Sequence, residues 1–482
     1  MRDMVLVLNF DDTASRVVTR KLRSERIMSK IVPGDIRLED VQAQEPLGLV
    51  LAGGVKGQTP SGLDGRLLQS GTPTLALGDA AAMLLGTLGG GAGETVLQGA
   101  VMGLQYQDGS LFQEVENGER LLQCVREFSL PEQVKSICAA QEFTVGFAHT
   151  ALPLYGLQFE MEQNDPEGSM ILRNFALNIC GCTTWWDENA FISGAVEEIG
   201  NLAGEGRAVC AMTGGLDSGV SALLAFKALG PRLQCVFVDT GLLRDREGDD
   251  FLAFYRDQVG MNIVRINAGD RFLEALKGVE DSEEKRNVIG QLIRRILREE
   301  QEKLGPFDAL IRGVSCNDVM FGNQPYAPAM SGLHVIEPVR ELFKEEIRSI
   351  GDFLGIPADI ISRQPFPGSG LALRILGEVT PERLQILREA DAIFRGEVLR
   401  SNAGKRLWQY FAVLLPLPQE ENAYAVCLRA VHASERSQTY AARLPYDVME
   451  NVVDLILRDL KQVRRVVYDL TPSANFSGIE WQ

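Results

Sequence analysis

The chain has few histidines, no excess of positive charge and no long apolar run. Only three of its 482 residues are histidine, which leaves few candidates for a catalytic general base. The net charge of −17 argues against an extended nucleic-acid interface and against binding to an anionic membrane. No segment approaches the roughly 18 apolar residues of a membrane span. We therefore expect neither nucleic acid nor membrane among the partners.

Cysteine usage points to a reducing compartment. The eight cysteines have no regular spacing, and Cys180 and Cys182 are the only close pair. With no second pair or neighbouring histidine, these two residues do not indicate a metal site. At the N-terminus, acidic residues follow the first apolar run at once, unlike a secretory signal. We predict reduced thiols and a cytoplasmic protein.

Length and patterning predict several α/β domains. A chain of this length accommodates two to four domains. Short β-rich runs alternate with helical patterns before residue 182, among them 5–9, 74–77 and 143–147, and we expect a mostly parallel sheet there. A second α/β pattern begins near Trp185, and charged helices alternate with strands after residue 375.

Residues 207–224 form the most informative segment. An apolar strand pattern, 208–212, meets the glycine turn Thr213-Gly214-Gly215, and Asp217 and Ser218 then begin an apolar helix. Glycines allow backbone N–H groups to approach a polyanion, and the helix N-terminus favours negative charge. The loop lacks the lysine of a G-x-x-x-x-G-K-[ST] motif. It resembles instead the S-G-G-x-D-S pyrophosphate loop of the ATP pyrophosphatase superfamily.

The whole chain resembles the glutamine-hydrolysing GMP synthases. Motif RQPFPGSGLALRILGE at 363–378 is the most specific match, and further blocks lie at 236–244, 285–290, 336–346, 465–469 and 479–481. The resemblance implies an α/β chain with three parts: a class I glutamine amidotransferase-like (flavodoxin-like) domain at 1–182, an ATP pyrophosphatase domain at 183–374 and a small α+β dimerisation domain at 375–482. It also implies a homodimer.

The same resemblance assigns the candidate site residues. ATP would be bound by Thr213, Gly214, Gly215, Leu216, Asp217, Ser218 and Asp239. The catalytic group would be Asp217, Asp318 and Lys344, and Mg²⁺ would lie at Asp217 and Asp318. Xanthosine monophosphate, the nucleotide substrate, would contact Gly368, Gln409, Arg465, Ile479 and Glu480. ATP would adenylate the C2 oxygen of this substrate, and ammonia would then displace AMP.

The amidotransferase half departs from the family at its catalytic positions. The nucleophilic cysteine of P-V-L-G-I-C-Y-G is replaced by Gly78. In the G-V-Q-F-H-P-E signature the histidine is replaced by Glu160, while Glu162 keeps the acidic position. His149 is the only histidine of this half and lies elsewhere in the sequence. Without a thiol at position 78 we predict no glutamine hydrolysis there, so that free ammonia is the nitrogen source.

The synthetase half is changed less. Asp318 is kept, but Phe321 replaces an acid, and a lid with two adjacent histidines is missing along with roughly a score of residues. Ser473 replaces a lysine expected near the nucleotide. Two other hypotheses therefore stay open. The first is an ATP-dependent enzyme with another acceptor or nucleophile, such as a purine-analogue amidating enzyme or a thiolating enzyme with Cys316 beside Asp318. The second is a non-catalytic nucleotide-binding paralogue.

Overall fold

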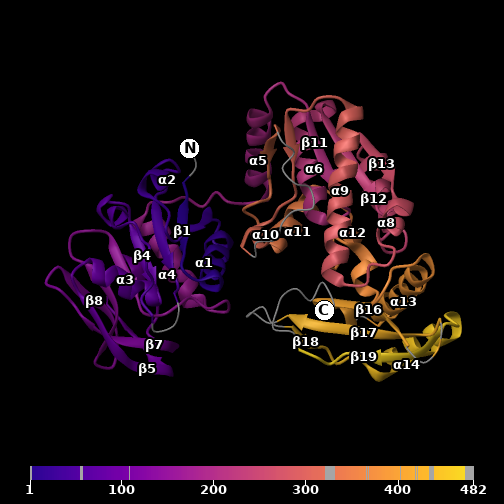
Figure 1. Ribbon diagram of the computed structural model, residues 1–482. Helices are drawn as coiled ribbons and strands as arrows, with labels where there is room; N and C mark the ends of the chain where they lie inside the picture. The colour runs from indigo at the N-terminus through magenta and orange to yellow at the C-terminus, as the bar shows by residue number, and fades with distance from the viewer. Residues whose placement is uncertain are drawn as a thin grey trace. The chain divides into compact units, whose positions relative to one another are not determined.

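The computed structural model describes residues 3–54, 58–107, 109–320, 332–364, 366, 368–401, 403–417, 420, 422–433 and 439–472. Contacts divide the chain into two compact units, 1–191 and 192–482 (Figure 1). The domain boundaries at 182/183 and 374/375 remain predictions. Among the described helices none is both long and apolar enough to cross a membrane.

The first unit is built on an eight-stranded sheet. Its strand order is β2 (Ser29–Pro33), β1 (Val5–Asn9), β3 (Gly48–Ala52), β4 (Thr74–Leu77), β10 (Leu154–Leu157), β9 (Phe143–His149), β8 (Val134–Ala140) and β6 (Gln105–Tyr106). The pairs from β2 to β10 are parallel, whereas β10–β9, β9–β8 and β8–β6 are antiparallel. A separate antiparallel ribbon joins β5 (Gly91–Gly103) to β7 (Glu119–Ser129).

Helices cover both faces of this sheet. In β1, Val5 and Val7 belong to one apolar core and Leu6 and Leu8 to the other, as the alternation of side chains along a strand requires. The helices are α1 (Asp12–Ser24), α2 (Leu38–Gln42), α3 (Asp79–Thr87) and α4 (Pro166–Asn174). Core residues of α1 and α4 pack on the first face, and those of α3 pack on the second.

The second unit contains a five-stranded parallel sheet. Its order is β13 (Ile263–Asn267), β12 (Leu233–Asp239), β11 (Ala208–Met212), β14 (Ala309–Ile311) and β15 (His334–Ile336). The surrounding helices are α5 (Glu188–Ala203), α6 (Leu216–Leu229), α7 (Glu247–Leu252), α8 (Gly269–Ala275), α9 (Ser282–Leu304), α10 (Cys316–Met320), α11 (Lys344–Phe353) and α12 (Ala358–Ile361). The chain leaves β11 toward β12 and returns to the other side of β11 as β14. Ligands of such sheets bind at the carboxyl ends of strands flanking this reversal.

A four-stranded sheet completes the second unit. Strand β17 (Tyr424–Ala433) pairs with β16 (Gln409–Pro416), β18 (Thr439–Ala441) and β19 (Val463–Tyr468). Helices α13 (Pro381–Arg400) and α14 (Tyr446–Asp459) accompany it. One apolar core runs from the β11 sheet into this part, because Val209, Leu371, Phe394 and Val426 belong to the same buried cluster.

Candidate functional site

The glycine turn lies where β11 ends and α6 begins. Gly214 has φ +83, a backbone conformation that residues other than glycine rarely adopt. The Ser218 hydroxyl donates to the Gly215 carbonyl at 2.9 Å and lies 3.3 Å from the Thr213 hydroxyl. Helix α6 starts at Leu216, whose side chain packs toward α11. The first N–H groups of α6 have no carbonyl one turn earlier, so they can bind an anion.

A second loop meets this turn at the strand reversal. Gly313 follows β14, and a Cβ atom there would lie 2.5 Å from the Ser218 backbone nitrogen. Only glycine allows the two backbones to come this close. This contact brings the loop at 313–318 beside the start of α6.

Asp217, Asp318 and Lys344 come together at this point. Lys344 begins α11, and its Nζ forms an ion pair with Asp217 and lies 3.6 Å from Oδ2 of Asp318. Oδ2 of Asp318 also accepts from the backbone N–H of Ser315 at 2.9 Å. The Lys344 side chain is 39% exposed, that of Asp217 is 20% exposed and that of Asp318 is 26% exposed. A ligand can therefore reach all three.

The two carboxylates attract a cation. Burial lowers the pKa of Lys344, but the charges of Asp217 and Asp318 outweigh burial and raise this pKa overall. Burial raises the pKa of the Asp217 carboxyl, and Lys344 opposes that rise. Two carboxylates with a place for phosphate oxygens match the way Mg²⁺ is usually bound. Since the described residues contain no group of three or more metal-binding side chains, phosphate would have to complete the coordination.

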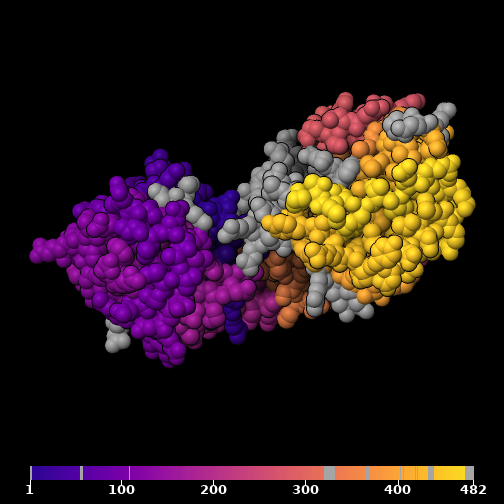
Figure 2. All heavy atoms as spheres, turned by 90° about the horizontal axis from the view of Figure 1, so that it is seen from below, coloured from indigo at the N-terminus to yellow at the C-terminus, as the bar shows by residue number. Residues whose placement is uncertain are grey.

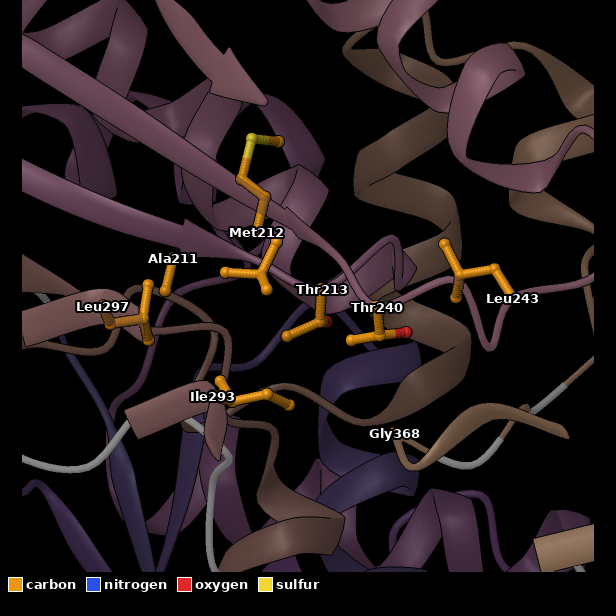
Figure 3. A pocket seen from close by; sticks show the side chains of 9 residues that line it. Ala211, Met212, Thr213, Thr240, Leu243, Ile293, Leu297 and Gly368 are labelled. Carbon is orange, nitrogen blue, oxygen red and sulfur yellow. The ribbon is translucent and has the colours of Figure 1, made fainter. Parts of the chain in front are cut away.

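An adjacent pocket opens at the ends of β11 and β12 (Figure 3). It is lined by Ala211, Met212, Thr213, Val238, Thr240, Leu243, Ile293, Leu297 and Gly368. Apolar walls with a few hydroxyl groups suit a nucleoside. Gly368 therefore lines the same pocket as Thr213 of the glycine turn.

Asp239 closes β12 next to the pocket. Its Oδ2 accepts from Arg265 Nη2 at 2.5 Å, and its Oδ1 accepts from the Gly241 N–H at 3.0 Å. Asp239 thus fixes the loop that carries Thr240. This carboxylate is engaged by a guanidinium and a backbone amide.

Of the other proposed substrate contacts, the two that the structure describes lie apart along one sheet. Gln409 is fully buried on β16 and pairs with Val431, whereas Arg465 is exposed on β19 and pairs with Ala425. Six residues along β17 separate these two positions, which is about 20 Å. Ile479 and Glu480 lie outside the described residues, as do Phe321, the segment that replaces the lid and Ser473. The assignment of these residues to the substrate stays a prediction.

The structure also reveals a buried arginine cluster that sequence reasoning did not single out. Arg244, Arg374 and Arg395 surround Asp391, with nearest N–O distances of 3.7, 3.8 and 2.8 Å. The Arg244 and Arg374 guanidinium groups lie 4.1 and 5.2 Å from the centre of the Phe366 ring. Nε and Nη2 of Arg244 are buried and have no hydrogen-bond partner among the described residues. The cluster therefore places three guanidinium groups around one buried carboxylate. Arg244 lies in the 236–244 block and Arg374 in the 363–378 motif, and only these positions could have drawn notice.

Gly78 lies at a sharp strand-to-helix turn in the first unit. It caps α3 directly after β4, with φ +62 and ψ −134. A Cβ atom there would lie 2.9 Å from Cγ and 3.1 Å from Oε1 of Glu160. The Glu160 side chain thus fills the space that a nucleophile at position 78 would need.

Neither His149 nor the Cys138 thiol of this unit has the surroundings of a catalytic group. His149 accepts through Nδ1 from the N–H groups of Ala151 and Leu152, at 3.1 and 2.9 Å, so it stabilises a turn. Burial raises the pKa of the Cys138 thiol to about 12. A thiol with so high a pKa is a poor nucleophile at neutral pH.

Comparisons with known proteins cover the whole chain. Residues 396–481 match the family model described as the GMP synthase C terminal domain. A protein of Clostridium acetobutylicum named GMP synthase (glutamine-hydrolyzing) is 35% identical over 518 residues, covering 100% of both chains. A Clostridium perfringens protein with the same name is 36% identical over 513 residues, again covering 100% of both. The solved structure of a glutamine amidotransferase from Thermotoga maritima aligns with 37% of this chain and 99% of its own, with 14% identity and a TM-score of 0.32.

Proposed function

Because this chain belongs to the GMP synthase family, we propose that it is a C–N ligase that makes GMP from xanthosine monophosphate, ATP and free ammonia. In the first step the C2 oxygen of the substrate forms a bond to the α-phosphorus of ATP, and the bond to pyrophosphate breaks. In the second step ammonia adds at C2, AMP leaves, and a proton is released. Oxide is a poor leaving group, so ATP converts the C2 oxygen into a phosphate ester that can leave as AMP.

The observation that carries this proposal is the meeting of Asp217, Asp318 and Lys344 beside the glycine turn. The N–H groups at the start of α6 would bind the β- and γ-phosphates, and the Lys344 ammonium would neutralise charge that gathers on departing pyrophosphate. Asp217 and Asp318 would hold Mg²⁺, which when bound offsets the negative charge of the phosphates. The pocket beside Gly368 would take the nucleoside of ATP.

The proposed ammonia source rests on the catalytic positions of the first unit. Class I glutaminases attack glutamine with a thiolate on a sharp turn, and here that turn carries Gly78 with Glu160 against it. A carboxylate in that place cannot form the thioester. We therefore propose that this unit does not hydrolyse glutamine.

The direct test measures GMP and pyrophosphate with ATP, Mg²⁺ and xanthosine monophosphate, supplying either ammonium or glutamine. We expect equal amounts of GMP and pyrophosphate with ammonium and neither with glutamine. Asp217→Asn should abolish both products, whereas Asp257→Asn, at a carboxylate that is 54% exposed, should change nothing. GMP from glutamine would refute the ammonia proposal. Pyrophosphate without GMP would favour another acceptor or nucleophile, and no turnover of ATP would favour a non-catalytic paralogue.

We further propose a homodimer. A groove between α14 and β19 is lined by Tyr446, Met449, Glu450, Val453, Asp454, Val466, Val467 and Tyr468. Tyr446 is 81% exposed and Val467 43% exposed. The last described residues, yellow in Figure 2, form a broad surface of this unit. Light scattering should give twice the chain mass, and Val467→Lys should halve it.

A further inference from the structure

Lys285 is a buried cation that the proposed chemistry does not use. It lies on α9 and is 0% exposed. Its Nζ donates to the carbonyl oxygens of Ile375 at 2.7 Å and Gly377 at 2.6 Å, and it lies 3.5 Å from that of Ala372. The ammonium is therefore directed at a backbone segment.

That backbone segment leads directly to the pocket. The 3₁₀ helix η6 (Gly370–Arg374) follows Gly368, and Lys285 holds the carbonyls at its C-terminal end. At its other end the Leu371 N–H donates to the Leu242 carbonyl at 2.8 Å. Gly370 has φ +66, and a Cβ there would lie 2.4 Å from the Leu242 oxygen. No other residue type could replace this glycine without moving the segment.

The helix that carries Lys285 also forms a wall of the pocket. Lys285, Ile289, Ile293 and Leu297 are spaced four residues apart and are all buried on one face of α9. Ile293 and Leu297 line the pocket, and Ile293 lies about 12 Å along the helix from Lys285. A rigid helix thus joins one wall of the pocket to the segment that carries Gly368.

Two opposing effects determine what Lys285 contributes. Removing an ammonium from water is costly, and burial lowers the pKa of Lys285 to about 8. The hydrogen bonds to carbonyls offset part of this cost. A cation that contributes little net stability but fixes three carbonyls is better suited to positioning than to stabilisation.

We propose that Lys285 is a positioning residue that holds the Gly368 turn against α9 and so sets the shape of the nucleotide pocket. This inference rests on the proposed function, in that the pocket and the turn bind nucleotides. The Lys285 ammonium donates to backbone carbonyls and takes no part in the chemical steps. Its loss should therefore weaken nucleotide binding more than it slows turnover.

The experiment compares Lys285→Met with Lys303→Met in the full-length protein. Lys303 lies on the same helix, is 66% exposed and pairs with Glu300, so its variant controls for the substitution itself. Binding of MgATP and of xanthosine monophosphate is measured by calorimetry, and KM and kcat by pyrophosphate release. We expect Lys285→Met to raise the Kd or KM of at least one nucleotide about tenfold with kcat within threefold, and Lys303→Met to match the wild type. A folded Lys285→Met protein with unchanged Kd and KM for both nucleotides, or with lowered kcat alone, overturns the proposal.

A measurement on the wild type decides the matter if Lys285→Met does not fold. Raising the pH from 7 to 9 removes one donor from Lys285, so the Kd should rise several-fold around pH 8. The charged groups around Lys285 are Arg383, Glu280 and Asp281, whose residue types keep their charge over this range. A constant Kd overturns the inference. Because binding is read without turnover, a wild type that binds MgATP but makes no GMP refutes the proposed function while Lys285 is still tested.

Discussion

The contact between Gly78 and Glu160 predicts a measurable energetic coupling. Gly78→Ala adds a methyl group at φ +62, a strained conformation that costs about 1–3 kcal/mol. The same methyl group would lie 2.9 Å from Glu160 Cγ, and such overpacking costs a further 1–3 kcal/mol or so. Gly71→Ala is the matched control, because Gly71 has φ +81 and no atom within 4 Å of the added Cβ.

Urea unfolding of the wild type, Gly78→Ala, Gly71→Ala and the double variant Gly78→Ala/Glu160→Ala separates the cost of backbone strain from the cost of overpacking. Gly78→Ala should lose about 2–5 kcal/mol of unfolding free energy, and Gly71→Ala only the conformational part. Adding Glu160→Ala, which removes Cγ, should recover about 1–3 kcal/mol in Gly78→Ala. If Gly78→Ala is no less stable than Gly71→Ala, or if Glu160→Ala brings no recovery, then Glu160 does not fill the turn and leaves room for a nucleophile there.

Three further predictions test other parts of the site. Gly313→Ala would place a Cβ 2.5 Å from the Ser218 nitrogen and should weaken MgATP binding at least tenfold, as measured by calorimetry. Gly200→Ala, whose added Cβ has no atom within 4 Å, should leave this affinity unchanged. Equal affinities of the Gly313→Ala and Gly200→Ala proteins would contradict the close approach. Lys344→Met removes a charge-assisted contact worth about 1.5–3 kcal/mol, so kcat/KM for pyrophosphate release should fall about 10- to 100-fold. An unchanged kcat/KM would exclude a role of Lys344 in catalysis. Burial raises the pKa of the Cys138 thiol and leaves this residue 0% exposed, so iodoacetamide should leave it unmodified at pH 8. Rapid labelling at pH 8, seen by mass spectrometry, would refute the assigned burial.

Much of the phosphate site could be predicted from local sequence. A strand, two glycines and an Asp-Ser helix start are encoded within residues 208–218, and the structure has β11 and α6 at these positions. The long charged pattern at 282–303 likewise became α9. Local patterns suffice here because hydrophobic periodicity and helix-start chemistry act over a few residues.

Contacts between distant segments could not be predicted in this way. The charge and length of Lys285 are typical of an exposed helical face, and only the arrival of the carbonyls of residues 372–377 explains its burial. The run at 143–147 is a strand as expected, but the mostly parallel sheet ends at β10, and β9 runs antiparallel to it. The apolar pattern of a buried strand does not encode its direction. Gln409 and Arg465 were assigned together by resemblance, yet pairing with β17 separates them.

The central claim is that ATP binds at the glycine turn with its phosphates beside Asp217, Asp318 and Lys344. Calorimetry with MgATP tests it most directly, using the wild type, Asp217→Lys and the exposed control Asp257→Lys. We predict binding heat in the wild type and in Asp257→Lys and none in Asp217→Lys. Equal binding by all three proteins, or no binding by the wild type, would contradict the account.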